Sequence, residues 1–159
     1  EPGPLGPRSR PCYSPPAPMN YARVGLAALA VWGAWFALGF LIHGVMLADV
    51  WEGLHRDGAI RTEAMTRTVM PVGTGLALFG SLVFSYVYAK GYEGGPGLQE
   101  GLRFGVLVGL LIVAFGVGWS YVTFPVPVEF LLWMSVAMVI QFAALGIAAG
   151  LVYRKRARR

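Results

Sequence analysis

The stretch FGVLVGLLIVAFGVGWSYVTFPVPV, residues 104–128, runs for 25 residues without a charged side chain. About 20 mostly apolar residues in a helix are enough to cross a hydrocarbon core of roughly 30 Å. The stretch shows no alternation of apolar and polar residues, which a membrane β-strand would require. A helix also satisfies its own backbone hydrogen bonds in lipid. The stretch therefore predicts a transmembrane helix.

Three further uncharged windows, at residues 24–48, 68–89 and 130–153, have 25, 22 and 24 residues and are also long enough to cross the core. The whole chain is 56% hydrophobic and 13% charged, whereas soluble domains are roughly 25% charged. A chain of 159 residues is too small to bury so much apolar surface in its own core. We therefore predict an all-α protein with four transmembrane helices and the lipid bilayer as its main partner.

Composition also divides the chain into segments. Residues 1–18 hold seven of the eleven prolines and lack the apolar content to fold alone, so we interpret them as an extension rather than a signal peptide. The predicted organisation is this extension, a membrane domain at 19–153 with spans at about 21–50, 69–89, 102–123 and 130–153, and a basic tail at 154–159.

The distribution of Lys and Arg predicts the orientation of the spans. Three of the thirteen basic residues lie in the loop at 49–68, and the other ten lie on the side of the termini. Positive charge is enriched on the cytoplasmic side, so we expect an antiparallel bundle in a bacterial inner membrane with both termini in the cytoplasm. The terminal RKRARR is typical of a topology anchor near anionic lipid, and we expect no nucleic-acid binding.

Small residues recur at every fourth position of the second and third predicted spans. Residues four apart share one face of a helix, and small residues allow close helix packing in lipid. We expect the two stripes to face each other, or one of them to face a neighbouring subunit. Membrane helices are also rich in glycine generally. The stripes are Gly73, Ala77, Ser81, Ser85 and Ala89, and Gly101, Gly105 and Gly109.

His43 lies inside the first uncharged window, and an ionisable group in a membrane span suggests a function. It is a candidate axial ligand for a haem or a chlorophyll-type magnesium, with Gly39 one turn earlier leaving room for a flat macrocycle. The alternative is a neutral histidine that is hydrogen-bonded to a neighbouring helix or that reaches the membrane interface.

Asp49, Glu52 and His55 are spaced by three, so they share one face if the helix continues. Together they offer ligands for a loosely held metal such as zinc. A di-iron bundle needs the Glu-x-x-His motif twice, and the chain has one copy. The alternative is a solvated helix end of mixed charge.

Gln141 is the most polar side chain near the middle of any span. It predicts either an interhelical hydrogen bond or a polar contact in a substrate path. No Asp, Glu, Lys or Arg lies deep in a span, although ion-coupled carriers normally keep one there. We also find no nucleophile–base pair and no phosphate-binding glycine loop with its lysine.

The segments LGFLIHGVMLADVW and EGLRFGVLVGLL resemble a group of small, uncharacterised four-helix bacterial membrane proteins. The resemblance covers most of residues 19–153, and it implies a fold but no activity.

The leading interpretation is a non-catalytic accessory or assembly subunit that packs against other membrane protein subunits, or against itself as an oligomer. One alternative is a small oligomeric carrier or channel, with Gln141 and His43 lining its path. Another is a pigment- or haem-binding subunit that uses His43.

Overall fold

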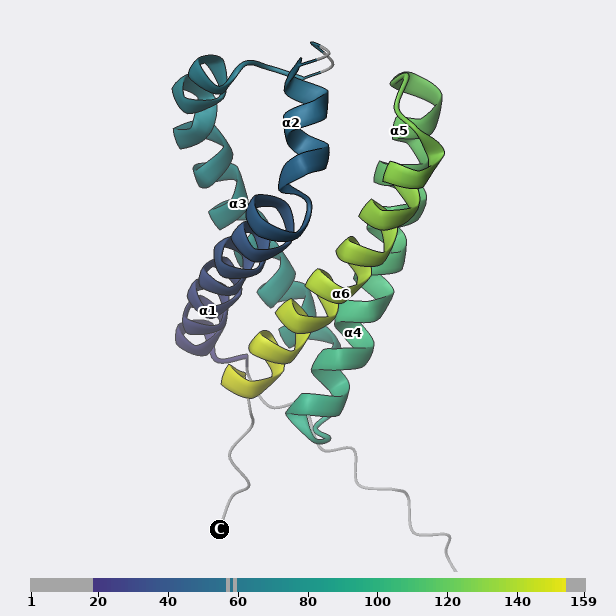
Figure 1. Cartoon of the computed structure of the whole chain (residues 1–159). Helices are drawn as coiled ribbons and strands as arrows, with labels where there is room; N and C mark the ends of the chain where they lie inside the picture. Colours follow the sequence, from purple (N-terminus) through teal and green to yellow (C-terminus); the bar gives the residue numbers. More distant parts are fainter. Residues whose placement is uncertain (1–18, 57, 59, 154–159) are drawn as a thin grey trace, which may run out of the picture.

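The structure consists of helices joined by short turns (Figure 1). The computed structural model describes residues 19–56, 58 and 60–153, and it has no strand within them. The expected extension at 1–18 and basic tail at 154–159 lie outside these residues. The elements in chain order are α1 (Tyr21–Gly39), the π-helical η1 (Phe40–Met46), α2 (Ala48–Arg56), α3 (Glu63–Gly91), α4 (Gly97–Ile112), the π-helical η2 (Val113–Val117), α5 (Gly118–Thr123) and α6 (Val128–Val152).

Four helical stretches are long and apolar enough to cross a membrane. They are Tyr21–Met46, Glu63–Gly91, Gly97–Thr123 and Val128–Val152. The shortest has 25 residues, more than the roughly 20 that a hydrocarbon core demands. The predicted all-helical class with four candidate spans is therefore confirmed, and the chain is a multi-pass membrane protein.

Polar side chains mark the first residues of two spans. The Asn20 side-chain oxygen accepts a hydrogen bond from the Arg23 backbone N–H at 3.1 Å, and the Thr62 hydroxyl accepts one from the Met65 backbone N–H at 3.5 Å. Such N-caps satisfy backbone donors that have no partner inside the helix. Because Thr62 caps it, α3 begins at Glu63 rather than near residue 69, and Pro71 lies inside the helix.

The first span breaks at Leu47, although we expected one helix over 21–50 and a polar loop after it. The helix changes from α-helical to the wider π-helical geometry at η1. Leu47, the residue after η1, is not helical, with φ −110° and ψ 18°. π-Helical segments within a helix are a recognised cause of helix bends. A separate helix, α2, follows in a different direction (Figure 1). The expected loop is thus partly helical.

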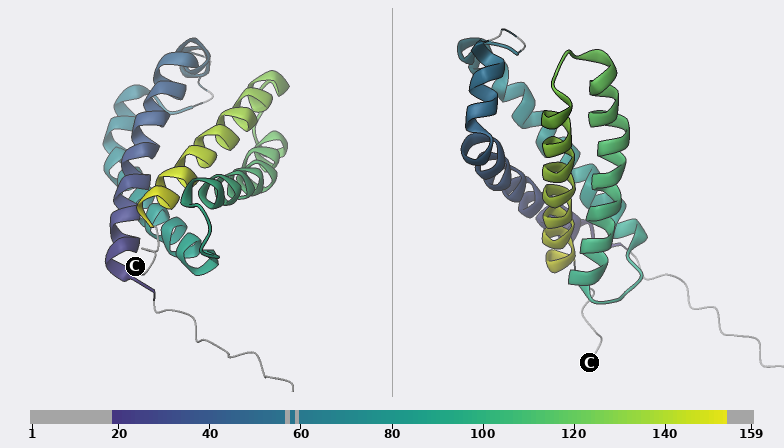
Figure 2. Two further views of the ribbon diagram at one scale, coloured as in Figure 1. Left: turned by 90° about the horizontal axis from the view of Figure 1, so that it is seen from below. Right: turned by 45° about the vertical axis from the view of Figure 1, so that its right-hand side comes forward.

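The helices form two halves that meet at one end. Figures 1 and 2 show α1 beside α3 in one half and α4 beside α6 in the other, and α1 also packs against α6. The halves diverge toward α2 and α5, which contain no buried residue. We call the packed end, where α1 begins and α6 ends, the closed end, and the other the open end. The core at the closed end consists of Val24, Ala27, Val31, Phe84, Tyr88, Leu145, Ala149 and Tyr153.

Aromatic rings connect three helices at the closed end. Tyr88 of α3 lies 5.4 Å from Phe104 of α4 and 6.3 Å from Tyr153, directly after α6, measured between ring centroids. Tyr92 lies 5.9 Å from Tyr153. Edge-to-face and tilted pairs at these distances stabilise beyond the area that they bury. The closed end is therefore held by ring contacts as well as by the aliphatic core.

Candidate functional site

His43 lies in η1 and packs against aromatic rings at the open end. Its ring meets that of Trp51 edge-on, with centroids 5.7 Å apart, and Trp51 meets Phe130 of α6 edge-on at 6.0 Å. Within the described residues, the His43 Nδ1 and Trp51 Nε1 atoms are buried without a hydrogen-bond partner. The Nδ1 atom of His43 therefore forms no hydrogen bond with the described part of the protein.

Gly39 does not open onto free space. A Cβ atom placed on Gly39 would lie 3.7 Å from the Nε2 atom of Gln141 on α6. The space that we expected a macrocycle to use is thus occupied on this side by a protein side chain. His43 remains the candidate cofactor ligand, but Gly39 contributes to helix packing instead.

Gln141 is completely buried between α6 and α1. Its Nε2 atom donates a hydrogen bond to the Trp35 backbone carbonyl at 3.3 Å, while its Oε1 atom has no partner within the described part of the chain. Gln141 lines neither of the two pockets described below. We expected Gln141 to form either an interhelical hydrogen bond or a polar contact in a substrate path. The geometry corresponds to the interhelical hydrogen bond.

Asp49, Glu52 and His55 all lie on α2 and are exposed. Glu52 pairs with Arg56 at 3.1 Å, and both side chains are more than 70% exposed. Across residues 19–56, 58 and 60–153, no three His, Cys, Asp or Glu side chains gather in a group that suits a metal ion. The structure therefore does not bring these three residues together around a common point.

The glycine stripe of α4 packs against α6. Cβ atoms on Gly101 and Gly105 would collide with the backbone of Gly146 and Phe142, and one on Gly109 would lie 3.0 Å from the Cα atom of Val139. Along these contacts, residue numbers rise in α4 as they fall in α6. The stripes of the second and third spans therefore do not face each other, because α6 occupies the α4 stripe. The other arrangement that we expected, with one stripe facing a neighbouring subunit, stays a prediction.

The small-residue stripe of α3 is covered over only part of its length. Ser81 and Ser85 are buried, and α3 packs mainly against α1. Ala89 and Ala77 are partly buried, whereas Gly73 is exposed, and a Cβ atom added to it would have no neighbour within 4 Å. The stripe therefore continues past the intramolecular contact onto an open surface.

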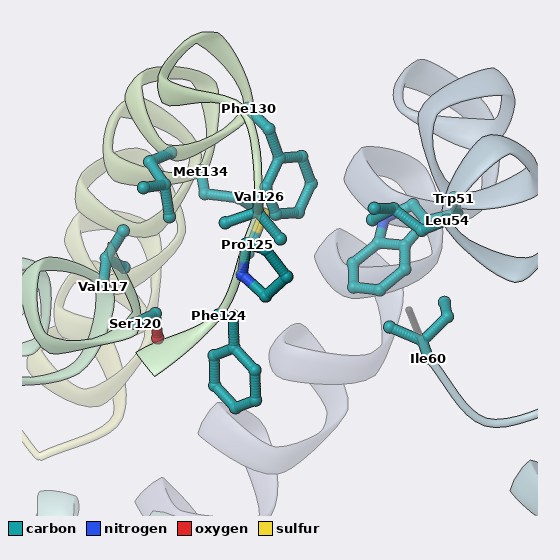
Figure 3. Close-up of a pocket in the computed structure, with 11 residues that line it drawn as sticks. Trp51, Leu54, Ile60, Val117, Ser120, Phe124, Pro125, Val126, Phe130 and Met134 are labelled. Atoms are coloured by element: carbon teal, nitrogen blue, oxygen red, sulfur yellow. The ribbon is translucent and has the colours of Figure 1, made fainter. Parts of the chain in front are cut away.

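Two apolar pockets occupy the open end, and the sequence did not reveal either. The long groove, about 760 Å³, lies between the first span and α6, where it is lined by Glu129, Phe130, Trp133, Val136, Ala137 and Ile140. The small pocket, about 370 Å³, lies between α2 and the turn before α6, and Figure 3 shows Trp51 and Leu54 facing Pro125 and Phe130 across it. Both volumes are in the range of ligand sites, roughly 300–1,000 Å³.

Comparison of the chain with protein-family models, with curated proteins and with solved structures gives no match. The function is therefore argued from the geometry of the chain itself.

Proposed function

We propose that this protein is a non-catalytic accessory or assembly subunit of a larger membrane complex. It would lie in a bacterial inner membrane as an antiparallel four-helix bundle with both termini in the cytoplasm. The proposed orientation rests on the bias of Lys and Arg toward the terminal side, since positive charge is enriched on the cytoplasmic side.

The uncovered part of the α3 stripe supports this proposal. In the most apolar window of α3, 11% of the residues are buried, the smallest share among the four spans. Gly73 leaves the α3 backbone accessible on the face that buries Ser81 and Ser85 further along. Lipid gives helices no hydrophobic reason to associate, so exposed backbone at small residues is the feature on which close helix contacts are built. We assign this face to a helix of another subunit.

The test compares two glycine variants of α3 that have the same space around them in the monomer. Neither Gly73 nor Gly75 has an atom within 4 Å of a Cβ position, but Gly75 is two residues away and points to a different side of the helix. The protein is isolated from its own membrane in mild detergent, and its migration on a native gel is recorded. We expect the wild-type chain and Gly75→Leu to migrate in a larger complex, and Gly73→Leu to migrate without it.

Mass spectrometry of the gel band then separates partner subunits from additional copies of this chain. A wild-type chain that migrates alone would contradict the proposal. Equal behaviour of Gly73→Leu and Gly75→Leu would show that the α3 face is not the contact.

Haem or pigment binding through His43 is the second candidate, because its Nδ1 atom is buried without a partner among the described residues. The visible absorption spectrum of protein purified from its own membrane decides this candidate. A bound macrocycle gives strong absorption bands in the visible range, and a colourless protein would rule out haem or pigment binding.

A further inference from the structure

We propose that the long groove binds one hydrocarbon chain of a phospholipid whose headgroup carries an ammonium group. This site lies between the first span and α6, so it is separate from the α3 face to which the proposed function refers. Three features support the assignment: the length of the groove, the protein contacts beyond its inner end, and the charged residue at its outer end.

The groove is as long as one leaflet. Its α6 wall runs from Glu129 at the start of the helix to Ile140, a rise of roughly 16 Å at 1.5 Å per residue. The opposite wall runs from Val50 back to Leu38. A hydrocarbon core is roughly 30 Å thick, so the groove extends from one interface to about the middle of the membrane.

Protein contacts join α1 and α6 just beyond the inner end of the groove. Directly beyond Ile140, Gln141 binds the Trp35 carbonyl, and Phe142 meets the Trp35 ring with centroids 5.8 Å apart. These contacts join α1 and α6 across the space that a longer occupant would need. A transmembrane helix requires the whole thickness of the core, about 20 residues, whereas a single acyl chain ends near the midplane.

The headgroup must supply the selectivity. An acyl chain gains little by moving from bilayer to groove, because both surroundings are equally apolar. Glu129 lines the outer end of the groove, and it makes no hydrogen bond or ion pair within the described part of the chain. Trp133 lines the same wall one turn further on, where its ring is able to attract a cation. A carboxylate and an indole at the rim complement an ammonium group and disfavour an anionic headgroup.

The experiment uses the full-length chain in mild detergent with three phospholipids that have the same acyl chains. Phosphatidylethanolamine, phosphatidylcholine and phosphatidylglycerol are added together, and native mass spectrometry counts the lipids that stay bound. We expect one lipid to be retained, with an ammonium headgroup favoured over the glycerol headgroup about fivefold, the upper range for an exposed ion pair.

Two matched pairs of variants locate the site. Val136 lines the groove and Leu132 does not, although both lie on α6 and are 52% and 63% exposed. We expect Val136→Trp to fill the groove and abolish retention, and Leu132→Trp to retain the lipid. Glu129→Gln should remove the headgroup preference, whereas Glu93→Gln, an equal change of charge on an exposed residue of the turn between α3 and α4, should preserve it.

Several results would overturn the proposal. Equal retention of the three lipids by the wild-type protein rules out recognition of the ammonium group. Equal retention by Val136→Trp and Leu132→Trp rules out the groove. If Val136→Trp loses a bound protein subunit rather than a lipid, the groove binds a helix of a partner or of a second copy. This result is independent of the Gly73→Leu test.

Discussion

Glycine residues in α4 and α6 allow the two backbones to touch. A Cβ atom on Gly146 would collide with the Gly101 carbonyl, and one on Gly105 would collide with the Phe142 carbonyl. The contact is therefore between main chains, with no side chain in between. In lipid such close approach provides van der Waals contact that the hydrophobic effect does not supply.

Gly105→Ala tests this contact with a single methyl group. Because the methyl group meets backbone atoms, which cannot rotate away, the helices must separate, and overpacking of this kind costs typically about 1–3 kcal/mol. We expect a clearly lowered midpoint of thermal unfolding in detergent.

The control is Gly75→Ala, also in a helix but with open space around the new methyl group. Alanine is the better helix former by up to about 1 kcal/mol, so we expect stability to stay equal or rise. If the two variants unfold at the same temperature, the proposed backbone contact is wrong.

Single residues also show where sequence reasoning reaches its limit. Gln141 is recognisable as a polar residue in an uncharged window, and a buried amide predicts a hydrogen-bond partner. Its acceptor, the Trp35 carbonyl, lies 106 positions earlier in the chain. No local pattern identifies such an acceptor, because it depends on which faces of α1 and α6 meet.

At the scale of elements, π-helical segments interrupt the first and third spans. η1 precedes α2, and η2 precedes α5, and neither α2 nor α5 contains a buried residue. In contrast, Gly97, Gly101, Gly105 and Gly109 of α4 are all buried. Segments with few buried contacts open locally at a lower free energy than the core. The open end is therefore the less stable part of each half.

Hydrogen–deuterium exchange in nanodiscs measures this difference. We expect the backbone amides of α2 to exchange at least about tenfold faster than those of α4 between Gly97 and Gly109, because opening is easier where no residue is buried. Slower exchange in α2 than in α4 would contradict the assigned core.

The periodic small residues did not determine which helices pack against each other. The α3 and α4 stripes look alike in the sequence, yet α4 uses its stripe on α6 and α3 uses part of its stripe on α1. All four spans are apolar on every side, so hydrophobic periodicity does not select the inner face. The partner of each stripe follows from the shape of the whole bundle.

At the scale of the whole molecule, the charges lie at the two ends of the spans. Residues 49–68 hold three of the thirteen basic residues. Within this range, α2 and the start of α3 lie at the open end (Figure 1). The turn at 92–96 lies at the closed end. The proposed orientation therefore places the open end, with the long groove, on the outer side of the membrane.

Cysteine labelling in intact cells checks the orientation. In a Cys12→Ser background, Arg61→Cys and Glu93→Cys place single thiols on exposed residues, one before α3 and one after it. We expect a reagent that cannot cross the membrane to label Arg61→Cys in intact cells, and Glu93→Cys only after lysis. The opposite result would reverse the orientation.

The sequence by itself determined the class of protein and the number of candidate spans. Uncharged runs of 22 to 25 residues are a local property, and their solvation by lipid depends on length and composition alone. For the same reason His43 and Gln141 stood out as polar residues in apolar surroundings.

Only the tertiary structure decided how the spans are used. It placed the break at Leu47, paired α4 with α6, joined α1 to α6 through Gln141 and left Glu129 at the rim of the long groove. These features depend on contacts between segments far apart in the chain. In lipid, where every apolar face is equally well solvated, such contacts are chosen by the fit of backbones and side chains rather than by hydrophobicity.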